Sequence, residues 1–174
     1  MSGTDSDEAG DWEVMNKILV QIGDGNTAAA GQTLVSYALG SCIGVCLYDK
    51  EIKIAGMVHA VLPAKKGGEV TAAEQQYRYA DQGIRRLIDQ MCSCGAKKSR
   101  LTAKLVGGAQ MFQTINYEWD IGKKNIQMAK KILAAEGIPL LAEDTGSDYG
   151  RTVWFTAEDG RVRVEAAKHP SIEL

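Results

Sequence analysis

The sequence predicts an α+β domain in which mixed and antiparallel β-sheets carry two main helices on their outside. Three observations indicate this class: strand-like runs gather at both ends of the chain, two amphipathic helical segments lie between them, and no linker or internal repeat divides the 174 residues. Because strict alternation of strand and helix is absent, we expect mixed strand pairing rather than an all-parallel sheet. A single domain is the simplest organisation for this length.

The N-terminal half of the chain consists mainly of predicted strands. From Trp12 to Ile22 apolar residues alternate with polar ones, the period of two that is typical of a half-buried strand. Residues 23–26 form a turn-like cluster. Three further strand-like runs follow, at Gln32–Leu39, Ser41–Tyr48 and Lys53–Leu62. Because only Asp49-Lys50, with Glu51 at most, separates the last two runs, we expect them to pair as a hairpin.

The C-terminal half contains the two helices. Apolar residues have helical spacing from Ala80 to Met91, and Gly95 stands where a helix cap is expected. A second helix is predicted at about Lys123 to Glu136, where a glycine and a proline follow it. Alternating residues around Leu101–Leu105 predict a strand between the helices. The strands predicted after them are Ile138–Ala142 and a hairpin of Thr152–Thr156 with Arg161–Glu165.

Composition and the chain ends exclude several classes of protein. The formal net charge is −2, so the sequence lacks the basic excess of a nucleic-acid-binding domain. Residues 1–11 are acidic and have no apolar run, which predicts a disordered tail rather than a secretory signal. We expect a single domain over residues 12–168 and a C-terminal tail at 169–174. Because no apolar stretch approaches the ~20 residues of a spanning helix, a cytoplasmic location is expected.

The four cysteines are expected to be free thiols. The chain is neither cysteine-dense nor visibly exported, which disfavours disulfides. A zinc site is also disfavoured, because Cys42 and Cys46 would lie ~13 Å apart along one strand. The pair Cys92 and Cys94 looks structural or merely exposed. The glycines around 107–108 and 122 lack the order of a nucleotide-binding motif, so no metal or cofactor is predicted.

Cys42 and His59 form the candidate catalytic pair. Gly40 permits a tight turn before the strand, where a thiol can lie beside backbone N–H groups that stabilise a forming oxyanion. His59 lies in the neighbouring predicted strand, and paired strands are ~4.8 Å apart. A thiol of pKa ~8.5 is mostly protonated at neutral pH, and imidazole can accept its proton. A core histidine without a catalytic role is the alternative for His59.

A third group should orient the imidazole, and hydroxyl groups are the candidates in this region. Ser36 lies in the preceding predicted strand, and Thr33 is close to it. The other histidine, His169, stands near the chain end and is the weaker partner for the thiol. Cys46 is interpreted as a core residue on the same face as Cys42.

At these residues the chain resembles the chemoreceptor glutamine deamidases, the CheD family of bacterial and archaeal chemotaxis. The resemblance extends from Trp12 to Val164, and its most specific part is LGSC followed by a histidine seventeen positions after the cysteine. The segments that match in order are Leu39–Tyr48, Gly56–Pro63, Tyr79–Asp81, Leu105–Phe112, Ile121–Asn125 and Leu140–Gly146.

The resemblance implies a catalytic domain in which Cys42 is the nucleophile, His59 the acid–base group and Ser36 the third member. The family usually has threonine at the third position, and serine keeps the hydroxyl but loses the methyl group that restricts the rotamer. The implied reaction is hydrolysis of glutamine side-chain amides on chemoreceptor cytoplasmic domains, through a thioester, to glutamate and ammonia. Some relatives also bind CheC-type phosphatases of the same pathway.

Two alternative hypotheses for the function of the chain stay open. The chain can be a weakly catalytic or non-catalytic interaction module that regulates a CheC-type phosphatase, or a different thiol enzyme such as a protease or transglutaminase. The resemblance also gives the basic residues a role, because receptor modification regions are acidic helical bundles. Lys65, Lys66, Arg85 and Arg86 are the candidates for docking such a bundle.

Overall fold

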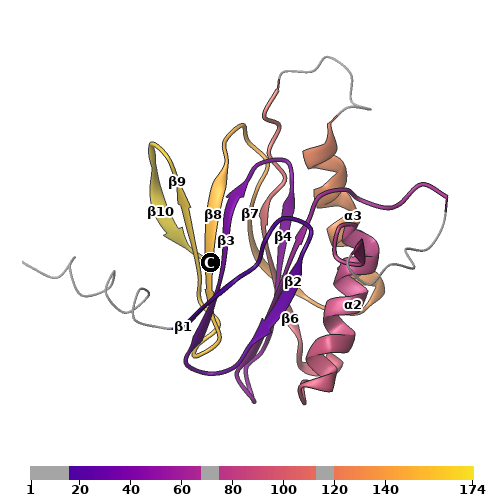
Figure 1. Ribbon diagram of the computed structural model, residues 1–174, viewed down its shortest axis with the longest axis vertical. Helices are drawn as coiled ribbons and strands as arrows, with labels where there is room; N and C mark the ends of the chain where they lie inside the picture. Colours follow the sequence, from indigo (N-terminus) through magenta and orange to yellow (C-terminus); the bar gives the residue numbers. More distant parts are fainter. Residues whose placement is uncertain (1–15, 68–74, 113–119) are drawn as a thin grey trace, which may run out of the picture.

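The computed structural model describes residues 16–67, 75–112 and 120–174, and in these it shows two five-stranded β-sheets packed face to face (Figure 1). Two α-helices pack on the outer face of one sheet. The α+β class predicted from the sequence is confirmed. The elements are β1 (Asn16–Leu19), β2 (Gly25–Ala28), β3 (Gln32–Leu39), β4 (Ile43–Asp49), β5 (Ile54–Ala60), α2 (Ala80–Ser93), the 3-10 helix η2 (Lys98–Arg100), β6 (Thr102–Gly107), α3 (Ile121–Ala135), β7 (Leu140–Thr145), β8 (Arg151–Thr156), β9 (Val162–Ala166) and β10 (His169–Glu173).

Both sheets are mixed. Sheet A has the strand order β1-β3-β8-β9-β10, in which β1 and β3 are parallel and the other pairs antiparallel. Sheet B has the order β2-β5-β4-β6-β7, in which β6 and β7 are parallel. The expected hairpin of β4 and β5 lies in the middle of sheet B.

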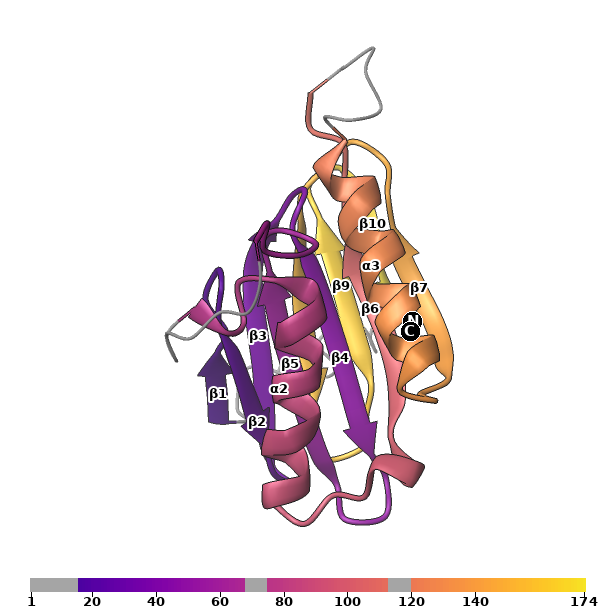
Figure 2. The same cartoon turned by 90° about the vertical axis from the view of Figure 1, so that its right-hand side faces the viewer.

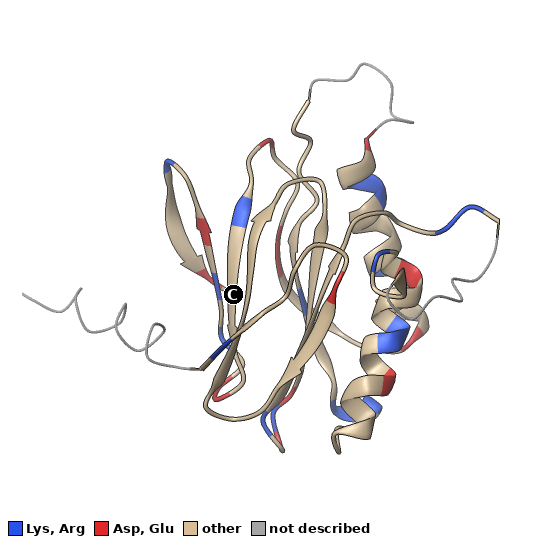
Figure 3. Ribbon diagram, viewed as in Figure 1, with Lys and Arg blue, Asp and Glu red and all other residues tan. Residues whose placement is uncertain are grey.

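The central strands of sheet B, β5, β4 and β6, are buried on both faces. The outer face of sheet B packs Val45, Val58 and Leu105 against the two helices, which lie side by side across it (Figure 2). Its inner face packs Met57 and other apolar residues against sheet A. Strands covered on both sides need apolar residues at successive positions, which is why the central runs of the sequence hardly alternate. Charged residues lie mainly on the helices and the peripheral turns (Figure 3).

The two helices follow the prediction closely. The apolar stripe of α2, from Ala80 to Met91, is buried, and the helix ends two residues beyond it. Helix α3 begins at Ile121, because the side chain of Asp120 accepts a hydrogen bond from the N–H of Lys123 at 3.0 Å and caps the first turn. Neither helix is long and apolar enough to cross a membrane, and the same holds for every other helix in the described ranges.

Two strands differ from the prediction. Residues 169–174, expected to be a tail, contain β10, which pairs with β9 at the edge of sheet A. The turn expected at 23–26 ends earlier, because Gly25 already belongs to β2 at the edge of sheet B. Both strands are short edge strands, and the side chains of β10 are exposed, so burial leaves no periodic pattern in them.

Other expected boundaries shift by a few residues or cannot be compared. The predicted strand at Ser41–Tyr48 begins only at Ile43, and the one expected from Ile138 runs from Leu140 to Thr145. The expected acidic tail at 1–11 and the start of the first strand at Trp12 lie outside the described residues.

A buried carboxylate joins the turn after β4 to the segment that follows α2. Asp49 has no exposed surface, and it accepts hydrogen bonds from the N–H groups of Glu51 (3.1 Å) and Lys97 (3.0 Å). The guanidinium of Arg100 pairs with it at 2.8 Å. Burial acts to raise the pKa of Asp49, but the hydrogen bonds from Arg100 and the two N–H groups outweigh it, so the pKa lies below its ordinary value.

We expect Asp49→Asn to destabilise the protein by about 2 kcal/mol at pH 7, since a buried charged acceptor is lost. A carboxyl whose pKa is lowered on folding stabilises the fold above its unfolded pKa of ~3.9, and this contribution disappears as pH falls through the folded pKa. The variant should therefore lose less stability than the wild type when urea unfolding is repeated at pH 3. Asp89→Asn, an exposed position on α2, is the control, and an equal effect at both positions would contradict the assignment.

Candidate active site

Strand β3 carries Ser36 into the space between the sheets. Its register with β8 shifts after Ser36, and the next two residues, Tyr37 and Ala38, are both exposed. Ala38 has a φ of 56°, a left-handed conformation that is unfavourable for a residue with a Cβ. This bulge returns Leu39 to the core and turns the chain toward the short segment Gly40-Ser41-Cys42, which crosses from sheet A to sheet B.

His59 reaches Ser36 from the opposite sheet. It lies on β5, is 2% exposed, and its Nδ1 is 2.7 Å from the Oγ of Ser36. The Ser36 hydroxyl donates its one hydrogen to the carbonyl of Val20, also at 2.7 Å. The Oγ must therefore accept from His59, so this hydrogen bond assigns the proton of the neutral imidazole to Nδ1. The ring nitrogen Nε2 is then an unprotonated acceptor.

Cys42 lies directly before β4, the strand that pairs with the strand of His59. The ladder pairs Gly44 with His59, and Cys42 stands two residues before Gly44, on the face that looks toward sheet A. Gly44 has no side chain between the two groups. The Nε2 atom of His59 is buried and forms no hydrogen bond with any described residue. Its lone pair is thus available to the thiol, and such contacts often tighten only when substrate binds.

The carbonyl groups of the segment Gly40-Ser41-Cys42 form hydrogen bonds with residues outside the candidate site. The carbonyls of Gly40 and Cys42 accept from the N–H groups of Ala109 (2.9 Å) and Gly108 (2.7 Å), and the carbonyl of Ser41 accepts from the Asn125 side chain at 2.8 Å. The N–H groups of Ser41 and Cys42 bond to no other residue in the described ranges. Two donors that no other described residue occupies, beside the candidate nucleophile, form a candidate oxyanion hole.

Glycines allow the backbone to pack closely behind the thiol. At Gly107, whose φ is 108°, a Cβ would lie 2.5 Å from the carbonyl oxygen of Cys42. At Gly122 a Cβ would overlap the carbonyl oxygen of Ala109. Gly107 and Gly122 therefore let the backbone pack closely behind Cys42. This packing accounts for glycines that form no nucleotide-binding motif.

Burial keeps both candidate catalytic groups neutral. The pKa of the Cys42 thiol is raised by burial, although its own backbone N–H and the charge of Arg78 act in the opposite direction. Burial also lowers the pKa of His59 to about 4. At neutral pH the resting pair is therefore a thiol and an uncharged imidazole, rather than a thiolate and an imidazolium.

One cavity opens beside the segment Gly40-Ser41-Cys42, which we call the thiol segment, and a second cavity shares a lining residue with the first. The first, which we name the Ser41 pocket, has a volume of about 270 Å³ and exposes Met111 (47%) and Phe112 (81%) at its edge. The second, named the basic cleft, has a volume of about 760 Å³ and is lined by Leu62, Pro63, Ala64, Lys65, Lys66, Tyr79, Ile121 and Lys124. Both cavities include Ile121, so the Ser41 pocket, which is lined by apolar residues together with Gln110 and Asp120, adjoins the basic cleft.

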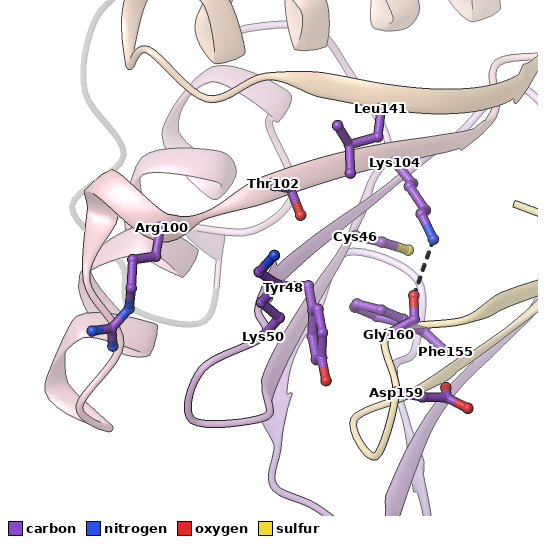
Figure 4. Close-up of a pocket in the computed structure, with 10 residues that line it drawn as sticks. All are labelled: Cys46, Tyr48, Lys50, Arg100, Thr102, Lys104, Leu141, Phe155, Asp159 and Gly160. Atoms are coloured by element: carbon purple, nitrogen blue, oxygen red, sulfur yellow. Dashed lines mark hydrogen bonds between the residues drawn. The ribbon is translucent and has the colours of Figure 1, made fainter.

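Cys46 faces a different cavity. This cavity, of about 430 Å³, lies further along β4 between the two sheets, where Lys104 donates to the carbonyl of Gly160 (Figure 4). Burial raises the pKa of the Cys46 thiol to about 12, and it is 1% exposed. The interpretation of Cys46 as a core residue on the same face as Cys42 is confirmed.

The remaining sequence candidates lie away from the thiol or form other contacts. His169 is exposed and stacks on Tyr149 with ring centroids 3.9 Å apart, so it is no partner for Cys42. Ser36, and not Thr33, bonds the imidazole. Cys92 and Cys94 are exposed free thiols. In the described part of the chain, no three metal-ligating side chains lie together.

Sequence reasoning missed Asn125 and Arg78. Asn125 donates to the residue before the thiol, and Arg78 influences the thiol through its charge. A signal existed for Asn125, because it precedes Ala129 and Ile132 at the spacing of the apolar stripe of α3. A polar residue on a core-facing stripe needs a specific partner. No comparable signal marks Arg78, which is exposed.

Comparisons with known proteins point to one family. The family model described as CheD chemotactic sensory transduction matches residues 61–166. A protein of Geobacter metallireducens, named probable chemoreceptor glutamine deamidase CheD 2, is 40% identical over 92% of this chain and all of its own length. A Pyrococcus horikoshii protein with the name probable chemoreceptor glutamine deamidase CheD is 42% identical over 86% of this chain and 92% of its own.

Among solved structures, the Bacillus licheniformis hypothetical protein YfiH matches with a TM-score of 0.46 and 15% identity. The match covers 69% of this chain and 49% of that one, and nothing about the site follows from it.

We expect Cys42 to react with iodoacetamide as a protonated, buried thiol. In a variant that keeps Cys42 alone (Cys46→Ala, Cys92→Ser, Cys94→Ser), the alkylation rate should rise with pH to a midpoint above the ordinary ~8.5. A matched variant that keeps only Cys92 measures the response of an exposed thiol. A rate plateau between about pH 5 and 8, the mark of a thiolate–imidazolium pair, would contradict the neutral resting state.

Proposed function

The chain belongs to the CheD family, and from this membership we propose that it is a chemoreceptor glutamine deamidase with Cys42 as its nucleophile. The observation that carries the assignment is the hydrogen-bonded pair of Ser36 and His59, which leaves Nε2 unprotonated and without a hydrogen-bond partner among the described residues. Relatives that are at least 39% identical over most of the chain have names that state the same activity. The substrate is the side-chain amide of selected glutamines on chemoreceptors.

The proposed reaction passes through a thioester. Nε2 of His59 takes the thiol proton while the sulfur attacks the amide carbon, and the N–H group of Cys42 receives the developing oxyanion. The C–N bond then breaks, and the imidazolium returns its proton to the leaving ammonia. Water attacks the thioester with His59 as base, the C–S bond breaks, and glutamate and the free thiol are formed.

The neutral resting pair is compatible with this chemistry. Since burial keeps the pKa of His59 low, the imidazole is an available base at pH 7. The imidazolium of His59 arises only when the thiol proton moves to Nε2 during attack. The hydrogen bond from Nδ1–H to Ser36 then stabilises this charged ring. Ser36 can supply this acceptor without the methyl group of the family threonine, because its hydroxyl is held by Val20.

The surface around the site suits an acidic, amphipathic helical substrate. The Ser41 pocket offers apolar side chains beside the nucleophile, and the basic cleft offers Lys65 and Lys66 next to it. The other two predicted docking residues are occupied: Arg85 pairs with Glu136 at 3.2 Å, and Arg86 bonds the Tyr77 side chain. We therefore limit the docking proposal to Lys65 and Lys66.

Two further points stay predictions of the family resemblance. Binding of a CheC-type phosphatase is one, and a cytoplasmic location, where receptor signalling domains would be reached, is the other. No observation favours an interaction module without catalysis over the deamidase.

We expect wild-type protein to convert glutamine to glutamate on a receptor cytoplasmic fragment, as detected by mass spectrometry, and Cys42→Ala to give no conversion. Ser36→Ala should lower kcat about tenfold, which corresponds to one hydrogen bond of about 1.4 kcal/mol. Ser36→Thr should keep most of the activity. Cys46→Ala is the matched control for loss of a buried thiol. Identical spectra for wild type and Cys42→Ala would disprove the enzymatic role on that substrate.

Charge reversal in the basic cleft should weaken substrate binding. We expect Lys65→Glu with Lys66→Glu to raise KM roughly tenfold and to reduce its dependence on salt, since an attractive surface becomes repulsive. Lys131→Glu with Lys168→Glu makes the same net change at exposed positions outside the cleft and should leave KM near its original value. A wild-type rate that does not respond to doubled ionic strength would refute the docking role.

A further inference from the structure

Asn125 is a fully buried polar residue on the core-facing side of α3. Asn125 has no exposed surface, and the other buried residues on its side of the helix are apolar. Its Nδ2 group donates to the carbonyl of Ser41 at 2.8 Å and to that of Val61 at 3.0 Å. Both hydrogens of the amide are therefore used, and both partners are backbone atoms of other elements.

The two acceptors flank the candidate catalytic groups. Ser41 directly precedes Cys42, and Val61 follows His59 by two residues. The last pair of the β4–β5 ladder is Ile43 with Ala60, so both carbonyls lie just beyond its end. The Asn125 amide thus bridges the segment before β4 and the segment after β5, at the point where the two strands separate.

The ladder cannot continue past this point. The N–H of Val61 is taken by the carbonyl of Arg78 at 2.8 Å, and its carbonyl is taken by Asn125. The carbonyl of Ser41 is taken by the same amide nitrogen. One planar group therefore sets the spacing between the thiol segment and the strand of His59. It also turns the Ser41 carbonyl away from the site, which leaves the following N–H free for an oxyanion.

The orientation of the Asn125 amide leaves one of its polar atoms, Oδ1, without a hydrogen-bond partner among the described residues. Turning it over would place Oδ1 against two carbonyl oxygens, so the assignment of its nitrogen follows from the hydrogen bonds. In this orientation Oδ1 is buried without a partner among the described residues. A buried amide whose oxygen accepts no hydrogen bond contributes little to the free energy of folding, so stability alone does not account for Asn125.

From this arrangement we infer that Asn125 is a positioning residue of the deamidase, which holds Cys42 at its working distance from His59 and aims the Cys42 N–H at the oxyanion. The inference rests on the proposed function. Displacement of a reacting group by about 1 Å is enough to lower a rate about 100-fold, so loss of the bridge should act on kcat rather than on KM.

The test uses Asn125→Asp, which keeps the shape but cannot donate, and Asn125→Ala. Ile132→Ala is the control, because it removes core packing from the same helix and belongs to a different hydrophobic cluster from Cys42. We expect both Asn125 variants to lower kcat about 100-fold with KM within about twofold of wild type. The control should keep its kcat at temperatures below its unfolding transition. If only one Asn125 variant folds, it suffices.

A second readout needs no receptor. In the variant with Cys42 as sole thiol, loss of Asn125 should let water reach the thiol segment, so the pH midpoint of alkylation should fall and the rate at fixed pH should rise. An alkylation profile equal to that of Ile132→Ala, or a kcat equal to that of this control, overturns the inference. If wild type fails to deamidate the receptor, the proposed function fails while the alkylation profile still decides the role of Asn125.

Discussion

The hydrogen bond between Ser36 and His59 joins the two sheets at the candidate site, and the proposed chemistry depends on it. Ser36 belongs to sheet A and His59 to sheet B, while the segment with Cys42 is the connection between them. The bond contributes only about 1 kcal/mol to stability, but its direction selects the tautomer of the imidazole. Because the three groups come from two sheets and their connection, the site exists only when the sandwich is assembled.

Much of the fold was predictable because its central elements bury side chains in periodic patterns. The stripe from Ala80 to Met91 and the short connection at Asp49-Lys50 predicted α2 and the β4–β5 hairpin. The edge strands β2 and β10 were not predictable, since backbone pairing places them and their side chains need no burial. β10 even contains Pro170, which is tolerated because the strand lies at an edge and its register is irregular.

The candidate site residues were proposed from the sequence, whereas their protonation states could not be predicted from it. Cys42, His59 and Ser36 followed from spacing, residue chemistry and the family resemblance, and the structure places Ser36 on the imidazole nitrogen that needs orienting. The raised pKa of the thiol was not visible, because desolvation depends on which residues the other sheet brings over Cys42. The contribution of Asn125 was hidden for the same reason, as its partners are backbone carbonyls from distant parts of the chain.

The protonated resting state of Cys42 has a consequence for its chemical survival. Peroxide oxidises thiolates to sulfenic acid, and susceptibility follows thiolate character and exposure. Cys42 is 7% exposed and burial favours its thiol form, so it is a poor target for oxidants while the site is empty. In the proposed mechanism, the sulfur becomes strongly nucleophilic only as its proton passes to His59 during attack on a bound amide. This mechanism would confine the reactivity of the thiol to turnover and protect it from oxidation between substrates.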